Sequence, residues 1–131
     1  MSLQIKESGW PLIVATMENA TFDETVEYLK RNEAWLKRKQ PYAIVLVLKG
    51  NNKVGSDIRQ AHADFMKRHA DEMKTHMTGL SLIVENSFIR AIVTSVLWMQ
   101  PIPCPYRTFS NDVEAGTAWA MEQLQARGAS V

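Results

Sequence analysis

Short hydrophobic runs alternate along the chain with longer stretches in which hydrophobic residues recur every three or four positions. The runs are rich in β-branched residues and are bounded by glycine, proline or polar residues, which is typical of strands. The longer stretches have the spacing of helices that bury one face. We therefore expect strands at 4–8, 11–18, 42–48, 79–85 and 106–109, and helices at 22–40, 57–77, 87–100 and 113–127.

The ends of these segments carry local signals. Thr21 is followed three residues later by Glu24, which is the pattern of a capping box at the start of a helix. Short polar residues and glycine favour the other helix boundaries, because they satisfy or release the unpaired backbone groups there. The expected boundary residues are Gly79 after the second helix, Ser87 before the third, Asn111 or Asp112 before the fourth, and Gly128 after it.

The helical spacing also predicts which side chains face the core. On the first helix the expected core residues are Phe22, Val26, Leu29 and Leu36. On the second helix they are Ile58, Ala61, Phe65, Met66, Ala70, Met73 and Met77. The charged residues Arg59, Lys67, Arg68 and Glu72 are expected to face water.

The order of the segments predicts the fold class. It is β-β-α-β-α-β-α-β-α, and such alternation favours a mainly parallel sheet with helices packed against it. The run from Tyr42 to Leu48 is hydrophobic throughout, as expected of a central strand covered on both faces. We expect one α/β domain over residues 1–131, with the extra first strand at an edge of the sheet.

Composition narrows the classes of function. Fifteen basic and fourteen acidic residues give a net charge of +1, so no basic surface for nucleic acid is expected. The single cysteine, Cys104, cannot form an internal disulfide and favours a reducing compartment, so we expect a cytoplasmic protein. The first residues lack the hydrophobic segment of a secretory leader, and no run reaches the roughly 18 residues of a membrane span.

The loop after the predicted central strand reads GNNKVGS, from Gly50 to Ser56. It approaches the phosphate-binding P-loop pattern, but the lysine that should follow the second glycine is absent, so nucleotide hydrolysis is not expected. Loops at the carboxyl ends of parallel strands are where α/β proteins usually place ligands. The candidate binding loop consists of Gly50, Asn51, Asn52, Lys53, Gly55, Ser56 and Asp57.

The element order resembles the SpoIIAA-like fold, which is shared by STAS domains (the anti-sigma-factor-antagonist family) and the lipid-binding part of SEC14-like proteins. In the anti-sigma antagonists, a serine or threonine at the helix start after this loop is phosphorylated by a partner kinase. Gly55, Ser56 and Asp57 occupy the matching place. The resemblance implies a regulatory or scaffold protein that acts by protein binding, with Ser56 as the phosphoacceptor; Ser56 as an ordinary helix cap is the simpler interpretation.

The predicted third helix is hydrophobic around most of its circumference. Burial by a neighbouring segment, a homodimer face and a groove for an apolar ligand are the three interpretations. The residues of this candidate face are Phe88, Ile92, Val96, Trp98 and Met99. In a carrier of SEC14-like type, this helix would line a pocket for a small apolar or lipid ligand together with Met66, Met73 and Met77.

The remaining reactive residues form no recognisable catalytic pattern. His62, His69 and His76 recur every seven residues, which separates neighbours by roughly 10.5 Å along a helix, too far to share one metal ion. Cys104 has no base near it in the sequence. We expect no enzyme activity, no metal and no cofactor, and the protein partner cannot be named from these patterns.

Overall fold

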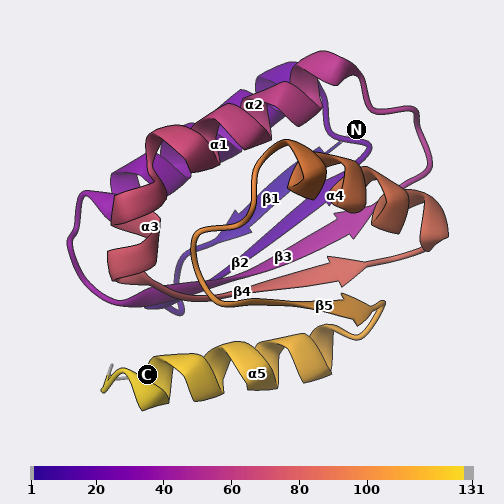
Figure 1. Ribbon diagram of the computed structural model, residues 1–131. Helices are drawn as coiled ribbons and strands as arrows, with labels where there is room; N and C mark the ends of the chain where they lie inside the picture. The colour runs from indigo at the N-terminus through magenta and orange to yellow at the C-terminus, as the bar shows by residue number, and fades with distance from the viewer. Residues whose placement is uncertain (1, 129–131) are drawn as a thin grey trace.

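A computed structural model describes residues 2–128 and contains one mixed sheet, flanked by helices on both faces (Figure 1). The strands lie side by side in chain order: β1 Ser2–Lys6, β2 Leu12–Glu18, β3 Tyr42–Lys49, β4 Met77–Val84 and β5 Tyr106–Ser110. β1 runs antiparallel to β2, and the other three pairings are parallel. The predicted α/β class and the position of the first strand at an edge are confirmed.

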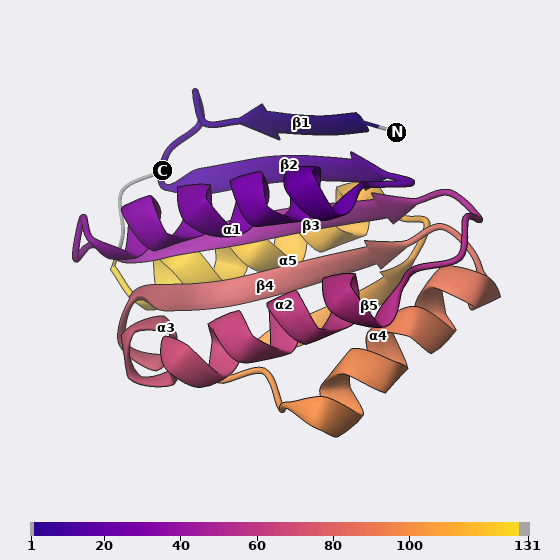
Figure 2. The ribbon, with the colours of Figure 1, turned by 90° about the horizontal axis from the view of Figure 1, so that it is seen from above.

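Five helices follow the strands: α1 Phe22–Leu36, α2 Ser56–Arg68, α3 Ala70–His76, α4 Ser87–Met99 and α5 Val113–Ala126. α1 to α4 lie over one face of the sheet, whereas α5 lies alone under the other face, as Figures 1 and 2 show. In Figure 2, α1 and α2 run along the strands, and α4 lies toward the β5 edge.

The central strands explain the two hydrophobic cores. Every residue of β4 and the first six residues of β3 are buried. Because successive side chains of a strand point to opposite faces, Ala43, Val45 and Val47 contact the α5 side, while Ile44 and Leu46 contact the side of α1 to α4. The hydrophobic run therefore supplies both cores, as predicted for a central strand.

The second predicted helix required two corrections. It divides at His69, whose backbone leaves the helical region at φ −111° and ψ 23°, so that α2 and α3 are separate helices. Gly79 was expected to end it but lies inside β4. A Cβ atom at Gly79 would lie 3.1 Å from the Trp119 ring of α5, so the glycine allows close approach of that helix.

The capping box of α1 is confirmed, since Thr21 and Glu24 exchange the two expected hydrogen bonds. The predicted core face of α1 was wrong in part. Phe22 is exposed and Leu36 is buried, while Thr25, Tyr28, Asn32 and Trp35 make up the rest of the buried stripe.

Three buried polar groups of α1 have hydrogen-bond partners. The Thr25 hydroxyl donates to the Thr21 carbonyl oxygen at 3.0 Å, and the Tyr42 hydroxyl donates to Asn32 Oδ1 at 2.6 Å. The indole nitrogen of Trp35 donates to a Glu7 carboxylate oxygen at 2.7 Å. Because these bonds offset the cost of burial, polar side chains can occupy core positions that the hydrophobic pattern did not include.

Two other helix caps differ from or refine the prediction. α4 is capped by Asn86, whose Oδ1 accepts from the Ile89 amide at 2.9 Å, and Ser87 is the first helical residue. Of the two residues proposed for α5, Asp112 is the cap.

Candidate functional site

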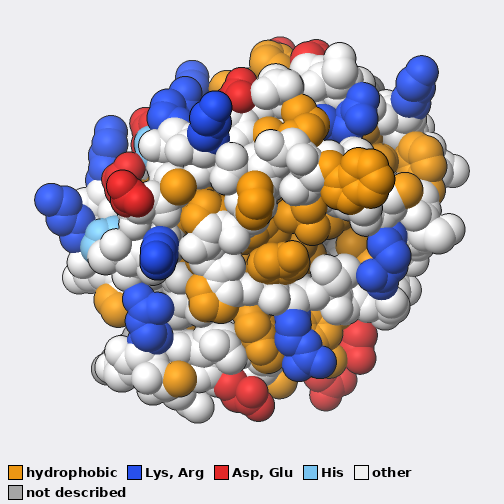
Figure 3. Space-filling model, viewed as in Figure 1, with side chains coloured by type: hydrophobic (Ala, Val, Ile, Leu, Met, Phe, Trp, Pro, Cys, Tyr) orange, Lys and Arg blue, Asp and Glu red, His pale blue; other side chains and the backbone are white. Residues whose placement is uncertain are grey.

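A cavity of about 150 Å³ lies between the sheet and helices α1, α2 and α4. Figure 3 shows hydrophobic side chains gathered in the middle of the molecular surface in this view, where the surface is hollowed. Side chains of the three central strands form its floor, namely Met17, Leu46, Leu48, Met77, Leu80 and Leu82.

Helix α4 forms one wall of the cavity. Ile89, Ile92, Val93 and Val96 recur at helical spacing on its inner face and line the cavity. Ile89 is the buried residue of this helix, whereas the other three are half-buried. The sequence had proposed Ile92 and Val96 for an interface or apolar-ligand face, and both lie where a ligand could contact them.

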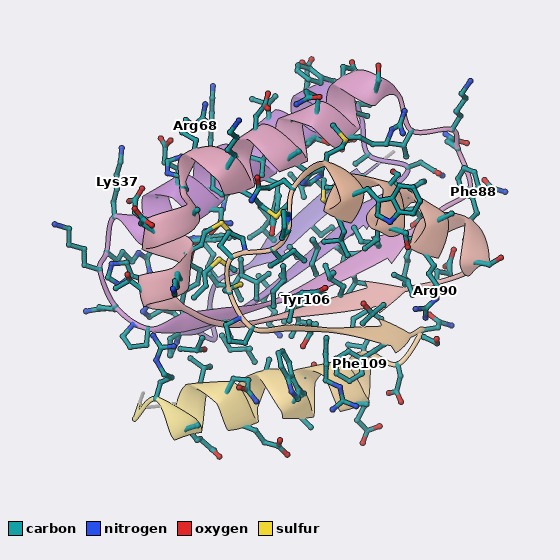
Figure 4. The ribbon with its side chains drawn as sticks, viewed as in Figure 1. Lys37, Arg68, Phe88, Arg90, Tyr106 and Phe109 are labelled. Atoms are coloured by element: carbon teal, nitrogen blue, oxygen red, sulfur yellow. The ribbon has the colours of Figure 1, made fainter. Side chains whose placement is uncertain are left out.

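The other three residues proposed for that face point elsewhere. Phe88 is 41% exposed, Trp98 87% and Met99 44%, so they lie on the outer side of α4. Figure 4 shows the Phe88 side chain at the outer end of the helix, directed away from the sheet. The structure therefore divides the predicted face of α4 into an inner and an outer part.

Four methionines line the cavity: Met17, Met66, Met73 and Met77. Figure 4 shows sulfur atoms, in yellow, between the sheet and the helices above it. Methionine side chains are flexible and polarizable, and they adapt to ligands of differing shape. The sequence had placed three of these methionines around a pocket, and the structure brings them together.

Arg59 lies against the cavity, although the helical pattern had placed it in water. This prediction was wrong because α2 and α4 pack against each other and Arg59 faces the cavity that both helices line. The Arg59 Nε atom is buried and has no hydrogen-bond partner among the described residues. A buried donor without a partner costs about 1–3 kcal/mol, so the Nε–H group is available to an acceptor from outside the described residues.

His62 lies one turn further along α2 and also lines the cavity. Its ring lies 6.4 Å from the Tyr28 ring, centre to centre. Burial lowers the pKa of His62 to about 4, so the imidazole is neutral at pH 7. Burial also raises the pKa of Tyr28, whose hydroxyl stays protonated.

The candidate binding loop begins at the edge of the same cavity. The Gly50 amide donates to a Glu85 carboxylate oxygen, and the Asn86 side chain donates to the Gly50 carbonyl oxygen, each at 3.1 Å. The next two backbone amides both donate to Asn19 Oδ1 at 3.0 Å. The ends of β2, β3 and β4 thus hold the first half of the loop in place.

The rest of the loop divides between cavity and solvent. Val54 and the exposed Asn52 border the cavity, whereas Lys53, Ser56 and Asp57 are exposed and do not line it. Ser56 had been interpreted as a helix cap, but it is the first residue of α2.

Gly55 occupies the cap position of α2 and makes no side-chain capping bond. The loop and the inner face of α4, which the sequence treated as separate candidates, therefore border one cavity.

The other reactive residues remain apart. Cys104 is buried, and burial raises its pKa to about 12, so the group is a thiol rather than a nucleophilic thiolate at pH 7. His69 contacts Glu33 at 3.2 Å and Glu72 at 2.8 Å, outside the cavity. Within residues 2–128, no group of three histidine, cysteine or acidic side chains is placed to hold a metal ion.

The fold and the cavity define an α/β protein whose single mixed sheet carries an apolar interior site on one face. Comparison of the chain with protein-family models, with curated proteins and with solved structures finds no match. None of the helices in the described part of the chain is both long enough and apolar enough to cross a membrane.

Sequence reasoning missed Arg59, Tyr28 and Asn32 as residues of the site. A signal for one of them was present: Arg59, His62 and Met66 are spaced three and four residues apart, so they share one stripe of α2. No comparable signal marked Asn32, because its burial depends on the Tyr42 hydroxyl, which comes from another element.

Proposed function

We propose that this protein binds a small apolar molecule in the cavity between the sheet and helices α1, α2 and α4. The cavity itself carries the proposal, because its lining is mostly hydrophobic and includes four methionines. Small-molecule sites are concave and mostly apolar, with a few polar groups that orient the ligand. Here Arg59 and His62 are two such polar groups.

The size of the cavity limits the ligand. Pockets for drug-sized molecules measure roughly 300–1,000 Å³. The volume here is about 150 Å³, which resembles an apolar cavity that accepts a single benzene ring. A single-ring compound or a short hydrocarbon chain fits this volume, and a larger molecule would place only part of its apolar chain there. Among the interpretations of the sequence, this favours the carrier of a small apolar ligand.

Methionine methyl groups supply a direct test. In protein labelled with ¹³C at these methyls, the four lining methionines would report on the cavity, while Met99 and Met121 would report on the outside of α4 and on α5. Titration with toluene or 1-hexanol should shift signals from the lining methionines in a saturable manner. Shifts confined to Met99 and Met121, or no shifts at all, would contradict the proposal.

A matched pair of variants on α4 sharpens this test. Val96→Phe places a ring in the cavity and should abolish the methyl shifts, while the unfolding temperature changes little because the added atoms occupy empty space. Trp98→Ala, on the outer side of the same helix, should leave binding unchanged. Equal binding by wild type and Val96→Phe would place the ligand elsewhere.

A second candidate function is protein binding through the loop from Gly50 to Asp57, as in the anti-sigma-factor antagonists that the element order resembles. The exposure of Ser56 at the first position of α2 favours it, since a phosphate there would meet unpaired backbone amides. The exposed Trp98 offers a further contact for a partner or for a second copy.

This candidate predicts a partner that distinguishes two variants at Ser56. Affinity capture with wild type, Ser56→Ala and Ser56→Asp should recover one protein whose yield falls with Ser56→Asp alone. Equal recovery with all three baits would remove the support for a phosphorylation switch.

A further inference from the structure

We propose that the ligand of the cavity is an apolar anion, whose negative group pairs with the guanidinium of Arg59. This inference rests on the proposed function, because it assigns the chemical class of the molecule that the cavity holds. It concerns a residue that the hydrophobic pattern had placed in water.

The charges around the cavity favour an anionic ligand. Arg59 and Lys49 line it, whereas no aspartate or glutamate is among its described lining residues. The histidine that shares the cavity, His62, is neutral at pH 7 and adds no competing charge. Lys49 follows Val47 in the alternation of β3, so its side chain is directed to the α5 side of the sheet. An anionic group on the ligand would therefore meet the Arg59 cation and no carboxylate among the described lining residues, whereas a cationic group would be repelled.

The hydrogen bonding of Arg59 carries the second step. Its Nε atom is buried and unpaired, and within the described part of the chain the residue forms no salt bridge. By contrast, Arg31 of α1 forms a salt bridge with Glu7. An arginine presents Nε–H and a neighbouring N–H side by side, which matches the two oxygens of a carboxylate or phosphate.

The position of Arg59 carries the third step. It lies in the first turn of α2, where the helix dipole adds partial positive charge. The Asp57 carboxylate of the same turn is exposed, is not among the cavity-lining residues and accepts from the Ile58 amide at 2.8 Å. The methionines, the leucines of the sheet and the inner face of α4 make the surroundings of Arg59 mostly apolar. The ligand class that fits both the Arg59 guanidinium and the apolar lining is a ring or short chain that ends in a carboxylate or a phosphate monoester.

Matched probes of one size test the inference. Phenylacetate is the anionic probe, 2-phenylethanol the neutral probe and phenethylamine the cationic probe, with phenyl phosphate as a second anion. The dissociation constants come from the methyl shifts of the lining methionines. Phenylacetate or phenyl phosphate should bind at least about tenfold tighter than 2-phenylethanol, and the amine should bind weakest; the better of the two anions identifies carboxylate or phosphate recognition.

Arg59→Met should abolish the preference for the anion and retain the binding of 2-phenylethanol. Arg68→Met is the matched control, since this arginine belongs to the same helix but points away from the sheet in Figure 4. It should preserve the preference. Arg59→Met should also leave the free protein as stable as wild type or more stable, because it removes an unpaired buried donor.

The outcomes separate the two proposals. Equal binding of the four phenyl probes would overturn the anionic ligand and leave the apolar site standing. A preference that survives in a folded Arg59→Met protein would overturn the assignment to Arg59. Failure of every probe to shift the lining methionines would overturn the proposed function together with this inference.

Discussion

One face of the sheet is covered by α5 alone and is closely packed, whereas the other face is covered by α1 to α4 and encloses a cavity. On the α5 face small residues bring helix and sheet together, since a Cβ atom at Gly116 would overlap the Cδ1 atom of Ile83. The Ser81 hydroxyl donates to the Gly116 carbonyl oxygen at 2.7 Å and ties the two layers.

The face of α1 to α4 is built differently. Its helices carry larger side chains, including Trp35, Phe65 and several methionines, and α4 buries Ile89 but leaves most of its surface partly exposed. The same five strands thus support one face that serves stability and another that leaves room for a ligand. Core packing therefore differs between the two faces, and it is looser on the face covered by α1 to α4.

The largest expected effect lies on the closely packed face. Gly116→Val adds a branched side chain where no space exists, and overpacking should lower the free energy of unfolding by about 3 kcal/mol. Urea denaturation followed by circular dichroism measures the change. Ala118→Val, at an exposed position of α5, controls for the propensity of valine in a helix and should cost under about 0.7 kcal/mol. Comparable losses in the two variants would remove the evidence for close packing.

A smaller effect concerns the pH dependence of the hollow face. The pKa of His62 is about 4 in the folded protein against 6.5 for the ordinary group, so between these values the unfolded chain binds a proton that the folded protein does not. Stability should therefore fall as the pH falls from 6.5 to 4. The pKa difference sets an upper limit near 3 kcal/mol, and the partial exposure of the residue reduces the expected loss to about 2 kcal/mol.

His62→Leu should remove this part of the acid sensitivity, as measured by urea midpoints across that pH range. The matched variant is His76→Leu, at a half-buried position of α3 outside the cavity. A pH dependence that His62→Leu leaves unchanged would show that other groups cause it.

The smallest effect concerns the polar pair beneath α1. Tyr42→Phe removes the hydrogen bond to Asn32 Oδ1 and leaves a buried acceptor unpaired, which should cost about 1 kcal/mol. Tyr28→Phe is the control, because the Tyr28 hydroxyl has no hydrogen bond to any described residue. Thermal unfolding of the two variants compares them directly, and an equal loss would contradict a role for the bond.

The hydrophobic pattern of the sequence predicted most of the fold but only part of the candidate site. The number and order of strands, the central position of β3 and the capping box at Thr21 follow from local patterns, and the structure confirms them. The buried face of α1 could not be read in this way, because Thr25 and Asn32 are accepted into the core by hydrogen bonds to other residues.

The site depends on distances that a linear pattern does not contain. The break at His69 occurs without glycine or proline, so no local signal marked it. The burial of the Arg59 Nε atom follows from the packing of α4 against α2, two helices that are separated in the sequence by α3 and β4. A cavity is a volume left between such elements, and only their three-dimensional packing reveals it.

The sequential strand order has a consequence for how the chain is made. Each strand pairs with the strand that precedes it, so a chain emerging from the ribosome can extend its sheet by one strand at a time. The face formed by Ala43, Val45, Val47 and Ile83 nevertheless stays bare until α5 has been synthesised. A nascent chain of about 110 residues would thus carry a complete sheet with one hydrophobic face exposed. We expect chaperone binding to matter most between the synthesis of β5 and that of α5.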